Sequence, residues 1–340
     1  MKVAANTVKI RQINTELIRS ALRQSGHGTK KSISGTTGLS VATCGNILKE
    51  LLESGEVLEM DLAGSTGGRP SRRFVYNQDY ARLLMMYLRQ EGAEKIIYTS
   101  VINMGGLVLR EERSCFSEIG LAELESLVDS FCSSFAGLKV IGIGVPGVVN
   151  TGIIELCDFD FLIGFPLAEY LQERTGLETV IENDVNCTAI GYFRAETDQS
   201  SESLAYIYYP KEGNPGAGIV VNGRILQGNS NFAGEVSYLP LGVSTDLQRK
   251  IQGDKGRFSN YVAKTVLSVN AIINPGTIVL SGYSFTPEIR ELVLQKVADE
   301  APAGHVPGLI FQEDIHDSYV EGLKYLALTK MSCEFELVRK

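Results

Sequence analysis

The apolar run at residues 140–145 (VIGIGV) constrains the fold of this chain more than any other stretch. It carries no polar side chain and ends at Pro146-Gly147, so it predicts a strand buried on both faces, as parallel strands are. Residues 117–135 before it have the apolar stripe of an amphipathic helix, and the pattern at residues 167–174 predicts another. Strand and helix patterns alternate toward the C-terminus, which predicts an α/β fold with helices covering a mixed sheet.

Length and composition set the broad class. A chain of 340 residues predicts two or three domains, and 44% hydrophobic with 21% charged residues is ordinary for a globular protein. No apolar run approaches 18 residues and the start lacks the apolar core of a secretory signal, so we expect a cytoplasmic protein without a membrane span. The six cysteines are scattered without a C-x-x-C pair, which predicts mostly buried, reduced thiols.

Charge is divided unevenly along the chain. Residues 1–78 carry 11 Lys+Arg and 6 Asp+Glu, a net charge of +5. The remainder carries 32 − 11 = 21 basic and 40 − 6 = 34 acidic residues, a net charge of −13. This asymmetry predicts that the N-terminal segment meets an anion.

The N-terminal pattern predicts helices at residues 13–22, 29–36 and 41–54, with a tight TGLS turn at residues 37–40 before the third. A strand is expected from residue 56, and another at residues 74–76 after the segment GSTGGRPSRR. This order is the plan of a winged helix-turn-helix, in which the second helix of the motif enters the DNA major groove. The alternative is a small helical module that binds another protein.

Polar side chains on this plan are suited to DNA. Ser40 can reach a phosphate, Thr43 and Asn46 can reach base edges, and guanidinium groups on the wing suit phosphate or a narrow minor groove. The residues predicted to contact DNA are Ser40, Thr43, Asn46, Lys49, Arg69, Arg72 and Arg73.

A glycine-rich stretch at residues 216–242 lies in the C-terminal half. Gly216 and Gly218 are expected to flank a bend, and Asn222-Gly223 is a strong signal for a two-residue hairpin turn. Glycines can let backbone N–H groups approach a ligand closely, but they also occur in ordinary hairpins. The glycines alone therefore favour the simpler interpretation.

The segment ENDVN at residues 182–186 follows a predicted strand, where α/β sheets bind ligands. Asp184 can accept a hydrogen bond from a ligand hydroxyl or act as a general base, and Asn183 offers both donors and an acceptor. The simpler alternative is that Asn183 and Asp184 cap the following helix. Both roles can hold together.

Four ordered motifs resemble the ROK family, which groups sugar-responsive repressors and sugar kinases. They are GIGVPGVVN at residues 142–150, ENDVN at 182–186, GAGIVVNGRILQGNSNFAGE at 216–235 and NPGTIVLSG at 274–282. The TGLS turn and the GGRP segment make the repressor branch the closer match. The resemblance implies an actin-like ATPase fold with two α/β lobes around a ligand cleft, and it places sugar contacts at Asn183, Asp184 and Glu235.

This sequence departs from the family pattern in three places. The family's kinases have an Asp-Ile-Gly-Gly-Thr phosphate loop where this chain has MMYLRQEGAEKIIY. Tyr238 takes the place of a zinc-bound histidine, and no cysteine occurs between Cys187 and Cys333, so thiolate ligation of zinc there is impossible. Tyr283 follows the adenosine segment and would crowd a nucleotide.

We therefore predict a DNA-binding regulator, a repressor of carbohydrate genes, with a kinase-like domain that is catalytically inactive. Its predicted sugar-binding residues are Asn183, Asp184, Glu235 and Tyr238, with Asp184 a relic of the kinase base and with no metal or cofactor. The predicted domains are a winged helix-turn-helix at residues 1–78, a first lobe at 79–190 with a C-terminal helix at about 316–330, and a second lobe at 191–315.

Operator DNA, a sugar effector and a second copy of the chain are the predicted partners. One alternative is a sugar kinase with a rebuilt phosphate loop. Another is a regulator controlled by a protein partner without a small ligand.

Overall fold

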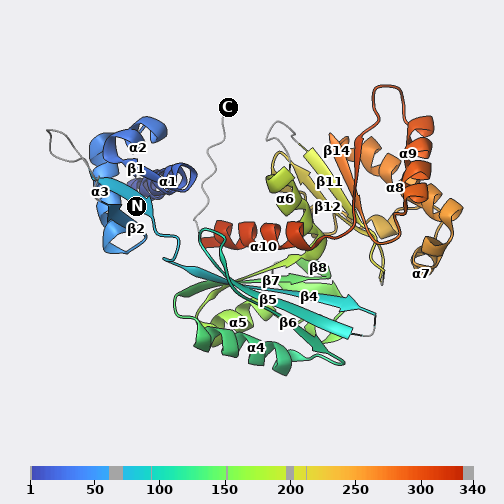
Figure 1. Cartoon of the computed structure of the whole chain (residues 1–340), viewed down its shortest axis with the longest axis horizontal. Helices are drawn as coiled ribbons and strands as arrows, with labels where there is room; N and C mark the ends of the chain where they lie inside the picture. The colour runs from blue at the N-terminus through green and yellow to red at the C-terminus, as the bar shows by residue number, and fades with distance from the viewer. Residues whose placement is uncertain are drawn as a thin grey trace. The chain divides into compact units, whose positions relative to one another are not determined.

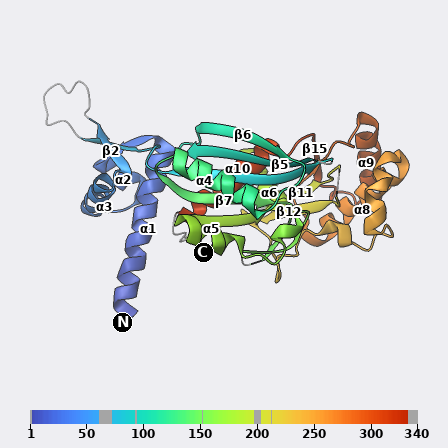
Figure 2. The same ribbon diagram turned by 90° about the horizontal axis from the view of Figure 1, so that it is seen from below.

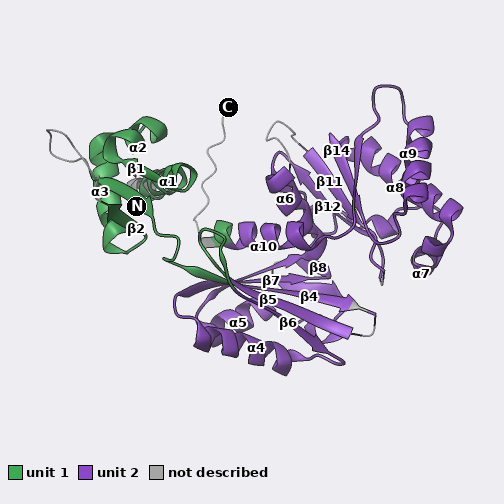
Figure 3. Ribbon diagram, viewed as in Figure 1, with its two compact units in different colours: residues 1–83, 102–109, 328–340 green, residues 84–101, 110–327 purple. Residues whose placement is uncertain are grey.

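The computed structural model describes residues 2–60, 72–92, 94–150, 152–196, 203–211 and 213–331. The chain divides into two compact units (Figure 3). Unit 1 comprises Met1–Leu83, Ile102–Leu109 and Leu328–Lys340, and unit 2 comprises Leu84–Val101 and Arg110–Ala327. No helix in these described ranges is both long and apolar enough to cross a bilayer.

The N-terminal part of unit 1 contains three helices and a small sheet (Figure 1). The helices are α1 (Lys2–Ser25), α2 (Lys30–Thr37) and α3 (Val41–Glu53). Strands β1 (His27–Thr29), β3 (Arg73–Tyr76) and β2 (Val57–Met60) pair antiparallel in that order. The three predicted helices and two predicted strands are confirmed, but β1 was missed because HGT has no apolar alternation, and α1 begins well before residue 13.

Capping side chains fix where these helices begin. The side chain of Thr29 accepts a hydrogen bond from Ser32 N, and that of Ser40 accepts one from Thr43 N at 3.1 Å. Gly38 ends α2 with a φ of 73°, a conformation that favours glycine. The apolar faces meet in a core that includes Ile18, Leu22, Ile33, Cys44, Leu48 and Phe74.

A first five-stranded sheet has the order β10-β7-β4-β5-β6. Its strands are β4 (Arg82–Glu91), β5 (Glu94–Asn103), β6 (Val108–Phe116), β7 (Leu138–Val145) and β10 (Glu178–Asn183), and β7 pairs parallel with β10. Helices α4 (Leu121–Ser134) and α5 (Leu167–Thr175) cover one face, and α10 (His316–Met331) lies on the other (Figure 1). The prediction of a buried strand at residues 140–145 is confirmed, but β6 was missed because its charged residues mask the pattern.

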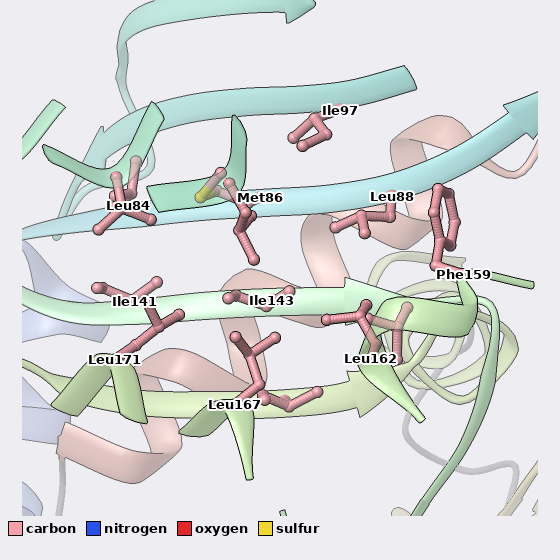
Figure 4. Packing of buried hydrophobic residues seen from close by; sticks show 14 of the residues in the cluster. Leu84, Met86, Leu88, Ile97, Ile141, Ile143, Phe159, Leu162, Leu167 and Leu171 are labelled. Carbon is pink, nitrogen blue, oxygen red and sulfur yellow. The ribbon is translucent and has the colours of Figure 1, made fainter. Parts of the chain in front are cut away.

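Strand β7 serves both faces of this sheet because successive side chains point to opposite sides. Ile141 and Ile143 join the buried cluster under α4 and α5, where they pack near Met86 and Leu167 (Figure 4). On the other face, a Cβ atom at Gly144 would lie 2.1 Å from the hydroxyl of Tyr319 on α10. The alternation of large and absent side chains in VIGIGV therefore lets α10 approach the sheet closely.

A second five-stranded sheet has the order β13-β12-β11-β14-β15. Its strands are β11 (Ser203–Tyr208), β12 (Gly216–Val221), β13 (Arg224–Ile225), β14 (Thr277–Ser281) and β15 (Gly308–Gln312). Helices α8 (Lys255–Ile273) and α9 (Pro287–Glu300) pack together beside it (Figure 2) and share its buried apolar cluster. Helix α6 (Asp184–Glu196) packs on β11 and β12. Parallel and antiparallel pairs occur in this sheet, so the predicted mixed α/β fold is confirmed.

The glycine-rich stretch contains one correct prediction and one error. Asn222 and Gly223 have φ values of 53° and 74°, as the predicted two-residue hairpin turn requires. Gly216 and Gly218 do not flank a bend, since both lie within β12. A Cβ at Gly218 would lie 2.3 Å from the carbonyl oxygen of Val185, so this glycine permits close packing of α6. After β7 the chain forms a short antiparallel hairpin of β8 (Gly147–Asn150) and β9 (Ile153–Cys157).

Candidate functional site

A cavity of about 790 Å³ lies in unit 2, within the ~300–1,000 Å³ range of small-molecule sites. Segments far apart in the sequence line it, and most of them follow the ends of strands. From the four sequence motifs the lining includes Pro146, Gly147, Asn183, Asp184, Gly216, Glu235 and Gly282. The structure thus brings one part of each motif to a common cavity.

Asn183 and Asp184 are positioned by hydrogen bonds at the junction of β10 and α6. Asn183 Nδ2 donates to the carbonyl oxygen of Gly147 at 2.7 Å and to Asp184 Oδ1 at 3.0 Å. The Asn183 side chain also accepts from Asn186 N at 2.9 Å, and Asp184 Oδ1 accepts from Val185 N at 2.9 Å. Helix capping is therefore present, and the same two residues also line the cavity.

Three carboxylates of the cavity lining share an environment that disfavours negative charge. Burial raises the pKa of Asp184 to about 7; the hydrogen bond from Val185 N opposes this, and the charges of Asp158 and Glu235 add to it. Burial also raises the pKa values of Asp158 and Glu235. Groups that donate hydrogen bonds to these carboxylates would offset their burial, so the cavity suits a ligand with several hydroxyls.

Glu235 and Tyr238 come from the turn that follows the glycine-rich stretch. Gly234 has a φ of 99°, and its carbonyl oxygen accepts from Ala217 N at 2.8 Å, which anchors this turn on β12. Tyr238 lines the cavity but is 60% exposed, and its ring packs against Phe232 with centroids 5.3 Å apart. The residue in the family histidine's place is therefore at the cavity mouth.

Another part of the lining comes from β4 and from the segment after β14, and it carries cationic, amide and aromatic side chains. Arg89 and Gln90 come from the end of β4, where the family's kinases have their phosphate loop. Tyr283 is 58% exposed, and Lys211 Nζ lies 6.0 Å from its ring centroid. A bulky aromatic ring thus occupies the stretch that follows the adenosine motif.

Asp158 and Tyr319 are among the residues of this lining that sequence reasoning missed. Asp158 follows β9, and a strand end was the only signal for it. Tyr319 is on α10, which the sequence predicted only as a C-terminal helix of the first lobe. Only the tertiary structure places it in the cavity wall.

In unit 1, the predicted DNA-contacting residues of α3 lie on its exposed side or at its start. Ser40 caps the helix and its Oγ lies 2.8 Å from Thr43 Oγ1. Asn46 is exposed, and Lys49 is 77% exposed with its Nζ 3.7 Å from Glu53. The opposite side packs inward through Cys44, Ile47, Leu48 and Leu51, so the Cys44 thiol is buried as the sequence analysis expected of most cysteines.

The arginines predicted for the wing fall at the edge of the described chain. Arg72 Nε lies 2.8 Å from Glu59 Oε1, and its side chain is 64% exposed. Arg73 is the first residue of β3 and is half-buried. Arg69 lies outside the described residues.

The sequence profile of the ROK family matches residues 92–256. The chain carries a ROK family domain. The family resemblance is thereby confirmed, and the match covers three of the four motifs and the cavity carboxylates Asp158, Asp184 and Glu235.

Relatives differ in how much of the chain they match. The xylose repressor of Caldicellulosiruptor bescii is 25% identical over 277 residues, which are 77% of this chain and 66% of that protein. The DNA-binding transcriptional dual regulator NagC of Escherichia coli K12 is 23% identical over 88% of this chain and 73% of its own length. An N-acetyl-D-glucosamine kinase of Histophilus somni is 36% identical, but over only 34% of this chain and 38% of its own.

Solved structures of ROK proteins have a similar fold. A ROK family transcriptional regulator, a homologue of the E. coli MLC protein, superposes with a TM-score of 0.71 at 19% identity, covering 94% of this chain and 99% of that one. A ROK hexokinase from Thermus thermophilus has a TM-score of 0.61 at 20% identity and covers 74% of this chain and 99% of its own. The ROK domain therefore has the α/β kinase-type fold that the motifs predicted.

Proposed function

We propose that this chain is a sugar-responsive, DNA-binding transcriptional regulator, a repressor of carbohydrate genes. The observation that carries this proposal is the extent of similarity. Repressors match most of the chain, whereas sugar kinases match a smaller share of it. A regulator accounts for both the ROK domain and the helical segment before it.

The N-terminal segment is proposed to be a winged helix-turn-helix. Helices α2 and α3 with the tight turn between them would form the motif, and β2 with β3 would flank the wing. Val41, Thr43 and Asn46 lie on α3 away from its buried side, where they could meet base edges. The net charge of +5 over residues 1–78 favours a polyanionic partner.

The cavity is proposed to bind a sugar effector through Asn183, Asp184, Glu235 and Tyr238. Carboxylate oxygens accept hydrogen bonds from hydroxyls, and the Asn183 amide is already oriented by Gly147. Effector binding would alter DNA affinity only if the sugar binds two states of the protein with different affinity. Operators of two-fold symmetry would then imply a dimer.

Catalysis is not part of this proposal. Residues Arg89 and Gln90 replace the family's phosphate loop, and the Tyr283 side chain follows the adenosine motif. A kinase would need both places to hold a nucleotide. Asp184 would retain only its role as a hydrogen-bond acceptor.

The test combines selection of DNA with effector titration. Duplexes enriched by the full-length protein from a random pool would be used in fluorescence anisotropy with D-glucose, D-xylose and N-acetyl-D-glucosamine. We expect at least one sugar to change DNA affinity. Hydrogen bonds to charged groups contribute about 1.5–3 kcal/mol, so Asp184→Ala should lower the affinity for that sugar by roughly ten- to a hundredfold. DNA affinity without sugar should stay near wild type.

Two outcomes would contradict this function. Failure to enrich any duplex would remove the DNA-binding role. Sugar-dependent release of ADP from ATP, abolished by Asp184→Asn, would establish the kinase alternative instead.

A further inference from the structure

Tyr319 is a buried tyrosine whose hydroxyl has no assigned role. The residue is only 2% exposed, and its hydroxyl has no hydrogen-bond partner among the described residues. A buried polar group without a partner costs free energy, so such groups call for an explanation. Tyr319 also belongs to the lining of the cavity that holds Asp184.

The ring of Tyr319 is held firmly in place. It packs against Tyr87 with centroids 4.6 Å apart, and Tyr87 stacks on Tyr98 at the same centroid distance. The Tyr87 hydroxyl is hydrogen-bonded to His316 Nδ1, in the first turn of α10. Gly144 supplies the space for the Tyr319 hydroxyl, since any side chain there would collide with it. A fixed ring with an unpartnered hydroxyl is the arrangement expected of a preorganised binding group.

Burial and nearby negative charge disfavour ionisation of the Tyr319 hydroxyl. The pKa of Tyr319 is raised well above its ordinary value, first by burial and then by the charge of Asp184. The phenol is therefore neutral at physiological pH and can donate one hydrogen bond. Asp184, which lines the same cavity, can only accept when ionised.

We infer that the Tyr319 hydroxyl contacts the ligand of the cavity and, together with Asp184, selects for a free hydroxyl group on it. A ligand hydroxyl can donate to Asp184 while it accepts from Tyr319. An ether oxygen can only accept, and a deoxy carbon can do neither. This inference rests on the proposed sugar-binding function and names a specificity-determining residue for it.

The variant Tyr319→Phe removes the hydroxyl and keeps the ring. Because the hydroxyl has no partner in the part of the chain that the structure describes, the melting temperature should be unchanged or higher. The matched control is Tyr261→Phe on α8. Tyr261 is also 2% exposed, but it does not line the cavity.

Calorimetric titrations would compare wild type, both variants and Asp184→Ala, all full-length. The probes are D-glucose, D-xylose and N-acetyl-D-glucosamine, followed by the monodeoxy analogues of the tightest binder. We expect Tyr319→Phe to lower the affinity for the parent sugar about three- to tenfold and Tyr261→Phe to leave that affinity unchanged. One monodeoxy sugar should bind wild type more weakly than the parent sugar does, yet bind wild type and Tyr319→Phe equally.

The outcomes separate this inference from the function on which it rests. If Asp184→Ala no longer binds the sugar while Tyr319→Phe binds it with wild-type affinity, the inferred role of Tyr319 is refuted and the proposed sugar site is retained. Equal losses in Tyr319→Phe and Tyr261→Phe would reduce the effect to a general change in packing and also overturn the inference. Wild type that binds none of the three sugars would refute the sugar function as well.

Discussion

Asp184 has both of the roles that the sequence analysis considered, helix capping and a place in the ligand cavity. Within the described residues, Val185 N and Asn183 Nδ2 donate hydrogen bonds to its carboxylate, and both end on Oδ1. One oxygen therefore serves the start of α6 while the carboxylate as a whole lines the cavity. A helix start at the end of a parallel strand naturally brings a capping carboxylate to the ligand crevice.

The raised pKa of Asp184 predicts a stability that falls as pH rises. In the unfolded chain this carboxyl titrates near 3.8, and in the folded chain near 7. Between these values the folded state holds the extra proton, so ionisation of Asp184 destabilises the fold progressively up to about pH 7 and fully above it. We expect Asp184→Asn to raise the melting temperature at pH 8, with the gain shrinking toward pH 5, in thermal unfolding followed by circular dichroism.

Asp129 provides a control of opposite sign. Its pKa is lowered by the hydrogen bond from Arg174, whose Nη2 lies 2.6 Å away. Asp129→Asn should therefore lower the melting temperature slightly at pH 8 and lose that effect at acid pH, since the stabilising ionised form is then absent. A gain for Asp184→Asn that did not depend on pH would contradict the raised pKa.

At the scale of elements, helices α6 and α10 meet through their backbones. A Cβ at Gly191 would lie 1.8 Å from the carbonyl oxygen of Ser318, and one at Gly322 would lie 1.7 Å from that of Cys187. Both helices also contribute to the cavity lining, α6 through Asp184 and α10 through Tyr319. The close crossing therefore fixes the positions of Asp184 and Tyr319 relative to each other, because each side chain is carried by one of the two helices.

Gly322→Ala should accordingly destabilise the protein. Overpacking costs about 1–3 kcal/mol, which corresponds to a fall in melting temperature of roughly 2–12 °C for a unit of this size. Gly253→Ala is the control, because a Cβ there meets no atom within 4 Å and its φ is not positive. An unchanged melting temperature for Gly322→Ala in differential scanning calorimetry would mean that the two helices can separate at little cost.

At the scale of the whole molecule, the chain joins a basic segment to an acidic remainder. The net charge is +5 over residues 1–78 and −13 over the rest. Nonspecific attraction to DNA therefore has to come from the N-terminal segment, while the remainder opposes it. The charge distribution therefore favours DNA binding at the N-terminal segment of the proposed regulator.

Replacing Arg69, Arg72 and Arg73 with Ala should weaken DNA binding and reduce its salt dependence by about one unit of slope for each lost phosphate contact. Fluorescence anisotropy at several salt concentrations would measure both quantities. The matched control replaces Lys250, Arg257 and Lys264, three exposed cations of unit 2, and removes the same charge. Equal effects of the two triple variants would mean that net charge, and not the wing, determines binding.

Much of this protein follows from local sequence. The capping residues Thr29 and Ser40, the Asn222-Gly223 turn and the apolar run at residues 140–145 depend on neighbours along the chain, so helices, hairpin and α/β class could be predicted. The ENDVN segment predicted a crevice because strand ends collect at one edge of a sheet.

The tertiary structure decided what depends on contacts between distant residues. The sequence left open whether Gly218 allows a ligand to approach or allows close packing. In the structure α6 occupies the space that a side chain would need, so this glycine allows close packing. Asp158 and Tyr319 entered the cavity wall through the meeting of separate segments, which no local pattern records. Side chains from remote positions share a site only after the chain has folded, so the composition of the site is a property of the fold.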